Sequence, residues 1–190
     1  MDKIPFVYTE ETVGTPVDKK ETENTIRLIA DRILKNTSYQ FIDRNTNATY
    51  RETDNLPVAD NIVLDSGYND WKYWNGVIHL AMMQIGHTFS DQKYIDYVRE
   101  NYRFAFKHLD YFRKLYDEEI YNANFHQFFR LDRLDDFGAM ASGLLEVLRY
   151  ESNPQYTDYI EKVANYILKK QDRLEEGIFC RNRFGKTTLW

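Results

Sequence analysis

The chain has 190 residues, a formal net charge of −5 and 43% hydrophobic residues, which suits one packed domain or a piece of a larger one. The acidic balance argues against a nucleic-acid partner, which would call for clustered Lys and Arg. No apolar run approaches the roughly 20 residues of a membrane span. The single cysteine, Cys180, excludes an internal disulfide bond and a cysteine-rich zinc site.

The positions of Gly and Pro and the spacing of apolar residues indicate a single domain over residues 1–190. We expect an extended lead-in over 1–20, a long loop over 37–70 and an aromatic-rich connection over 117–133. The C-terminal tail is predicted to hold a short hairpin between Gly177 and Trp190. Helices are predicted over Thr22–Lys35, Tyr73–Thr88, Gln92–Tyr116, Asp136–Tyr150 and Gln155–Gln171.

Aromatic residues make up 16% of the chain, with 15 Tyr, 12 Phe and 3 Trp. Such a surplus suits a bulky core and also suits a sugar-binding cleft. The helix over 73–88 is so apolar that we expect it to be buried over most of its girth. The N-terminus lacks the apolar stretch of a signal peptide. The protein is therefore expected to be cytoplasmic, or periplasmic if a signal peptide was removed before this numbering begins.

An internal repeat appears when the chain is shifted by 62 residues, which places Gly76–Val98 on Gly138–Ile160 without a gap. Each copy is a buried helix, a tight turn and a more amphipathic helix, so we predict repeated αα-hairpins over 71–116 and 134–172. Helical hairpins of this size commonly stack into superhelices or close into a toroid. The alternation of buried helices with helices that keep one solvent-exposed face favours an all-α fold that closes into an (α/α)6 toroid. A ring of six hairpins needs about twice this chain, so we expect a truncated ring whose open apolar edges could self-associate.

The repeat also points to a candidate site. Trp74 and Asp136 each lie two residues before a shared Gly, at equivalent N-terminal ends of two inner helices that would face the same mouth of a toroid. Helix N-termini favour anions, and a carboxylate beside a Trp suits a sugar site in which one group stacks and the other moves a proton. The alternatives are that Asp136 is a helix N-cap and that Trp74 packs in the core.

Neighbouring residues extend this candidate. Asp135 adjoins Asp136, and repulsion between adjacent carboxylates can raise one pKa toward general-acid use; the alternative is a loop whose arginines balance the acids. His126 lies in the aromatic connection and is a candidate ligand contact. The four histidines lack metal-binding spacing, and no dinucleotide or phosphate-binding motif occurs. These absences leave no motif for a metal site or a nucleotide-binding site in the sequence.

Two runs of residues resemble the unsaturated glucuronyl and rhamnogalacturonyl hydrolases of glycoside hydrolase families 88 and 105. The first is Trp-Lys-Tyr-Trp-Asn-Gly at 71–76, and the second is Arg-Leu-Asp-Arg-Leu-Asp-Asp-Phe-Gly-Ala-Met at 130–140. The resemblance covers roughly Asp65 to Trp190. The closing residues Gly-Lys-Thr-Thr-Leu-Trp at 185–190 look like the approach to the family's next motif, a Trp followed shortly by an Asp.

The resemblance implies an (α/α)6 barrel that takes part in polysaccharide degradation. Enzymes of these families act on an unsaturated uronic acid at the non-reducing end of lyase-generated oligosaccharides, and they hydrate the C4–C5 double bond without a cofactor. By motif, Asp136 matches one of two active-site aspartates and Trp74 matches an aromatic residue near the substrate. The second aspartate belongs to the motif that begins at Trp190, so this chain alone is expected to be weakly active or inactive. The other reading is a non-catalytic helical-repeat module that binds a carbohydrate or a protein.

Overall fold

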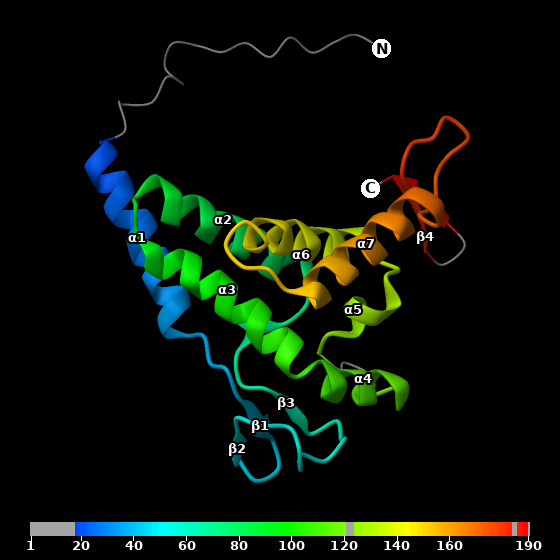
Figure 1. The fold of residues 1–190 in the computed structure, drawn as a ribbon, viewed down its shortest axis with the longest axis horizontal. Coiled ribbons are helices and arrows are strands. Elements are labelled where there is room, and N and C mark those ends of the chain that lie inside the picture. Colours follow the sequence, from blue (N-terminus) through cyan, green and yellow to red (C-terminus); the bar gives the residue numbers. More distant parts are fainter. Residues whose placement is uncertain (1–17, 121–123, 184–185, 190) are drawn as a thin grey trace. The chain divides into compact units, whose positions relative to one another are not determined.

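The fold is described by a computed structural model that covers residues 18–120, 124–183 and 186–189. These residues hold seven α-helices and two small antiparallel sheets, which confirms the predicted all-α class (Figure 1). The chain divides into two units, Met1–Lys35 and Asn36–Trp190, and each is described by itself. Within the described ranges, no helix is long and apolar enough to cross a membrane.

The described part of the first unit is helix α1 (Lys19–Lys35). It begins three residues before the predicted start because Asp18 caps it: the Asp18 Oδ1 accepts hydrogen bonds from the main-chain N–H groups of Lys20 and Glu21. Ala30 is the one residue of this helix that is buried. Residues 1–17 of the predicted lead-in lie outside the described range, and its last residues belong to the start of this helix.

The second unit contains the remaining elements. In chain order they are β1 (Phe41–Asp43), β2 (Thr49–Tyr50), β3 (Ile62–Leu64), the short 3-10 helix η2 (Gly67–Asn69), α2 (Tyr73–Thr88), α3 (Gln92–Lys107), α4 (Leu109–Asp117), α5 (His126–Arg130), α6 (Leu134–Val147), α7 (Pro154–Lys169), β4 (Cys180–Arg183) and β5 (Lys186–Leu189).

Helices α2 and α6 form an inner pair that runs side by side in the same direction (Figure 1). Near their N-terminal ends the main chains meet so closely that a Cβ on Gly76 would overlap the backbone of Ala139, so glycine is required there. Near their C-terminal ends, the Tyr150 hydroxyl lies 3.0 Å from Nε2 of His87. Contacts at both ends keep the two helices parallel.

Helices α3 and α7 pack outside this pair, α3 on α2 and α7 on α6. Each has 16 residues, and the 62-residue shift places the first and last residues of α3 on those of α7. The two hairpins therefore share one architecture, an inner helix of the α2–α6 pair followed by an amphipathic outer helix.

The prediction of a loop over 37–70 was wrong, because this stretch forms a three-stranded antiparallel sheet in the order β2-β1-β3. Its strands have only two or three residues, too few for an alternating pattern to show in the sequence. Long-range packing stabilises them. Phe41 of β1 is buried against the rings of Phe104, Tyr111 and Phe112. The three strands lie at the bottom of Figure 1.

Two helices also differ from the prediction. The helix expected over 92–116 breaks at His108, which separates α3 from α4; His108 packs against the ring of Phe41 there. The connection over 117–133 holds the short helix α5, which lies between two left-handed residues, Phe125 (φ 66°) and Leu131 (φ 54°). Phe125 keeps this costly conformation because its ring is buried in the aromatic core.

The predicted C-terminal hairpin is confirmed as β4 pairing with β5.

The core of the second unit is largely aromatic. Trp71 is its centre, 1% exposed, with its ring in contact with Tyr102, Phe128 and Tyr159. Its indole Nε1 donates a hydrogen bond of 3.0 Å to the Tyr159 hydroxyl, which satisfies a buried polar group. Much of the aromatic surplus therefore serves packing.

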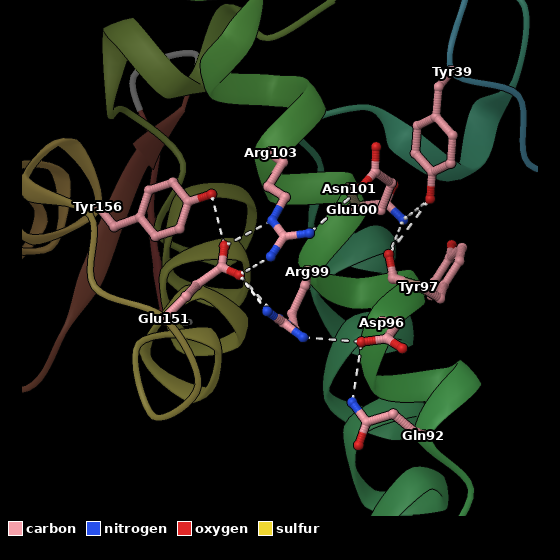
Figure 2. Close-up of polar contacts among 10 residues, drawn as sticks. All are labelled: Tyr39, Gln92, Asp96, Tyr97, Arg99, Glu100, Asn101, Arg103, Glu151 and Tyr156. Carbon is pink, nitrogen blue, oxygen red and sulfur yellow. Dashed lines mark hydrogen bonds and ion pairs between the residues drawn. The ribbon is translucent and has the colours of Figure 1, made fainter.

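An ion-pair cluster ties the two hairpins together. Glu151, in the turn between α6 and α7, accepts hydrogen bonds from Arg99 and Arg103 of α3 and from the Tyr156 hydroxyl (Figure 2). Arg99 also pairs with Asp96 at 3.0 Å. A carboxylate shared by two guanidinium groups fixes the position of this turn against α3.

Candidate functional site

The candidate site is built around Asp136, in the first turn of α6. It does not cap its own helix, whose N-cap is Arg133. Instead its Oδ1 accepts a hydrogen bond of 2.9 Å from the main-chain N–H of Tyr73, the first residue of α2. Lys72, the N-cap residue that precedes Tyr73, makes no side-chain hydrogen bond that caps α2. Asp136 thus caps the neighbouring inner helix, a role that the sequence alternatives did not include.

Asp136 is only 6% exposed, and this burial raises its pKa above the ordinary value. The Tyr73 N–H opposes the rise, Asp135 adds to it, and the charges of Arg133 and Lys72 oppose it more weakly. The Oδ2 atom lies 3.8 Å from Nη1 of Arg133, beyond hydrogen-bond distance. One oxygen therefore serves the fold while the other can exchange a proton.

Two aromatic side chains lie at the start of α2, whose first main-chain N–H binds this carboxylate. Trp74 is 45% exposed and Tyr73 is 47% exposed, and their ring centroids are 5.4 Å apart in an edge-to-face arrangement. The alternative that Trp74 packs in the core is therefore wrong. An exposed Trp beside a buried carboxylate offers a stacking surface for a sugar ring.

The rest of α2 is also more exposed than predicted. Val77, Leu80, Ala81 and Gln84 are exposed along one face, so the expectation of burial over most of its girth was wrong. The sequence did not reveal this face because Val77, Leu80 and Ala81 are as apolar as residues of α2 that are buried, such as Met82 and Met83.

The other two predicted site residues lie in different settings. Asp135 is exposed next to Asp136, and its Oδ1 accepts a hydrogen bond from the Asp136 N–H. His126 instead lines a cavity of about 390 Å³ whose other described lining residues are Tyr116, Asp117, Glu119 and Arg130. Burial and the nearby Arg130 lower the pKa of His126. The structure thus joins Trp74, Asp135 and Asp136 at two helix ends, and it places His126 in a neighbouring connection.

Sequence reasoning missed two residues that shape this site. Lys72 places its Nζ 5.3 Å from the centre of the Trp74 ring and 2.6 Å from Oδ2 of Asp70. Lys72 lies inside the Trp-Lys-Tyr-Trp-Asn-Gly run, so its position beside Trp74 was an available signal. The Tyr73 contribution comes from its main-chain N–H, which no residue pattern reveals.

The chain is similar to a family of known proteins. The model of Glycosyl Hydrolase Family 88 matches residues 39–190. The chain belongs to this family. The Family 88 match begins near the first sheet and includes both inner helices, and therefore every predicted site residue. No curated protein matches the chain at a significant level.

Membership of Family 88 identifies the chain with glycoside hydrolases that act on unsaturated uronides, so an oligosaccharide is the class of substrate that the family implies. Within the described residues, no group of three or more His, Cys, Asp or Glu side chains is arranged to hold a metal ion.

Proposed function

We propose that this chain acts on oligosaccharides that end in an unsaturated uronic acid, and that Asp136 supplies the reacting proton. The single observation that carries the proposal is the setting of this carboxylate. It is buried, its pKa is raised, and one of its oxygens is held by α2. A carboxyl group whose pKa is raised keeps its proton to a higher pH than an ordinary aspartate does, which suits a general acid.

In the proposed reaction the bond that changes first is the C4–C5 double bond of the terminal sugar. Asp136 donates a proton to C4, and a water molecule adds its hydroxyl to C5 and returns a proton to the carboxylate. The resulting C5 hemiketal opens by breaking its ring C–O bond, which leaves a hemiacetal at C1. That hemiacetal collapses to an aldehyde and releases the adjoining sugar as an alcohol. This route differs from the two-carboxylate displacement at C1 of most glycosidases.

The neighbouring residues take binding roles in this proposal. Trp74 stacks on the terminal sugar, since its ring is half exposed beside Asp136. Asp135 accepts hydrogen bonds from sugar hydroxyls from its exposed position in the first turn of α6. His126 contacts a more distant part of the oligosaccharide from its own cavity. No step requires a metal ion or an organic cofactor.

The test uses unsaturated disaccharides made with polysaccharide lyases from pectin or glycosaminoglycans. Turnover removes the double bond and its absorbance near ~235 nm, and loss of the acid should lower the rate by about a hundredfold or more in Asp136→Asn. Asn keeps an oxygen that can accept the Tyr73 N–H, so the helix contact survives. Asp158→Asn is the matched control, because Asp158 is exposed on α7.

Binding is measured in parallel by tryptophan fluorescence, since Trp74 lies at the proposed site. Full activity in Asp136→Asn would contradict the assignment of Asp136. Binding without turnover in the unaltered chain would favour the alternative, a non-catalytic module that holds a carbohydrate. If the unaltered chain neither binds nor turns over any unsaturated uronide, the proposal is overturned.

We also propose that the two hairpins belong to an (α/α)6 barrel and that apolar residues on the inner helices form an edge through which copies of the chain associate. Val77 and Leu80 of α2 and Leu145 of α6 are exposed, and exposed apolar groups of this kind mark interaction surfaces. Sedimentation over a wide range of protein concentrations tests self-association. A monomer at every concentration would contradict it.

A further inference from the structure

We propose that Lys72 binds the carboxylate of the terminal uronic acid and makes the site select acidic over neutral sugars. This inference rests on the proposed function and adds a residue that recognises the charged group of the substrate. It is carried by the position of one ammonium group among a buried anchor, an exposed ring and the Asp136 carboxylate.

The ammonium group of Lys72 is held in place by a buried partner. Its Nζ lies 2.6 Å from Oδ2 of Asp70, whose side chain is 4% exposed. The other oxygen of Asp70 accepts hydrogen bonds from the main-chain N–H groups of Trp71 and Phe125. These three contacts hold the Asp70 carboxylate in place. The ammonium group paired with it therefore loses much of its conformational freedom.

This anchoring leaves binding capacity on the lysine. An ammonium group carries three donors, and the ion pair to Asp70 takes one direction. The Lys72 side chain remains 41% exposed, so solvent or a ligand reaches it. Its Nζ lies over the Trp74 ring, 5.3 Å from the ring centre, which places the charge next to the surface on which a sugar ring would stack.

The chemistry of the substrate requires a cation in this position. In an unsaturated uronic acid the carboxylate is attached to C5, and C5 is bonded to C4, the atom that receives the proton. Groups that bind the carboxylate and donate the proton must therefore lie close together. Lys72 meets this requirement, because the next residue, Tyr73, donates its N–H to Asp136.

The arginines near the site are less suited to this role. Arg133 lies 3.8 Å from Oδ2 of Asp136, so its charge faces the proposed acid. Arg130 pairs with Asp132 at 2.6 Å. Lys72 is close enough for its charge to oppose the rise in the pKa of Asp136, yet its ion pair is with Asp70. It can therefore receive the substrate without displacing the acid.

The experiment compares an unsaturated disaccharide with its uncharged methyl ester. We expect the unaltered chain to bind the acid more tightly than the ester by about tenfold to a hundredfold, the range of a charge-assisted hydrogen bond. Lys72→Gln should lose this preference while its affinity for the ester stays unchanged. Lys72→Arg should regain part of it. Affinities are measured by titration calorimetry at fixed salt.

Lys107→Gln is the matched control. Lys107, the last residue of α3, forms a similar ion pair with Glu52 at 2.7 Å. It should keep the full preference for the acid. An undiminished preference in Lys72→Gln would overturn this inference and leave the proposed function standing. If the unaltered chain binds neither the acid nor the ester, the proposed function fails and this inference fails with it. Circular dichroism and thermal unfolding verify that each variant is folded.

Discussion

Helices α2 and α6 occupy equivalent positions in the two hairpins, yet their matching residues lie in opposite environments. Trp74 is half exposed, whereas its counterpart Asp136 is buried. The reason is that the N-terminal end of α6 meets the N-terminal end of α2, and Asp136 turns toward it. Two helices of one repeat therefore differ because each has different neighbours, even where the backbone repeats.

The two shared glycines show the same contrast. A Cβ on Gly76 would overlap the main chain of Ala139 and Met140, whereas a Cβ on Gly138 would meet only a Leu134 methyl group at 3.6 Å. Repeated glycines in these hairpins therefore need not have repeated functions. In the described chain, Gly76 is required by a close helix contact and Gly138 is not.

The largest expected effect comes from breaking this glycine contrast. Gly76→Ala should lower the free energy of unfolding by about 3 kcal/mol or more, because rigid backbone must move to admit the methyl group. Gly138→Ala should leave stability unchanged or raise it by up to about 1 kcal/mol, the difference in helix propensity. Urea unfolding of both variants measures this. Equal costs at the two positions would show that the close contact is not decisive.

A second contrast concerns His79 in α2, whose counterpart in α6 is Ala141. His79 is 1% exposed, and neither ring nitrogen has a hydrogen-bond partner among the described residues. Burial lowers its pKa to about 3, although the nearby Asn101 opposes the shift. The unfolded chain therefore binds a proton between pH 6.5 and 3 that the folded chain does not.

It follows that the His79 contribution to stability is fully present above pH 6.5 and falls as the pH is lowered. His79 contributes up to about 1.4 kcal/mol per pH unit to this slope. In His79→Leu the slope between pH 6 and 5 should shrink by about that amount, whatever the variant does to packing. Chemical unfolding at several pH values measures it. A slope that does not change would mean that His79 can be protonated in the folded protein.

The smallest expected effect concerns the turns of the two hairpins. Glu151 in the second turn is held by Arg99 and Arg103, whereas the matching residue in the first turn is Phe89. Burial raises the pKa of Glu151, but the hydrogen bonds from both arginines outweigh it and lower the pKa. Glu151→Gln should cost about 1 kcal/mol of stability.

The Glu151 contribution is present above the ordinary glutamate pKa and is lost as the pH falls through the lowered value. Thermal unfolding at pH 7 should therefore separate Glu151→Gln from the unaltered chain, and strong acid should bring them together. High salt should also reduce the difference. A variant as stable as the unaltered chain at pH 7 and low salt would show that the ion pairs contribute nothing.

The helices could be predicted where amphipathic spacing is long and local. The predicted Tyr73–Thr88 agrees with α2, because its apolar residues recur at helical spacing within one continuous stretch of the chain. The sheet around Phe41 could not be predicted, since its strands form through contacts with residues far along the chain. The break at His108 has the same origin.

The site was predictable in part. The repeat singled out Asp136 and Trp74, because equivalent positions in parallel hairpins must lie near one another. The raised pKa of Asp136 was expected from its neighbour Asp135, but burial is the larger cause. The hydrogen bond from the Tyr73 main chain and the anchoring of Lys72 by Asp70 depend on how two helix ends meet, which the order of residues does not state.

The hydrogen bond between Tyr73 and Asp136 has a stereochemical consequence. Oδ1 is held by a main-chain N–H at 2.9 Å. The carboxyl group therefore cannot rotate to exchange its two oxygens without breaking the hydrogen bond that caps α2. In the proposed reaction the proton would therefore reside on Oδ2 and leave in one fixed direction. Hydrogen should arrive at C4 on a single face of the sugar ring, so turnover in heavy water would place deuterium there with one configuration.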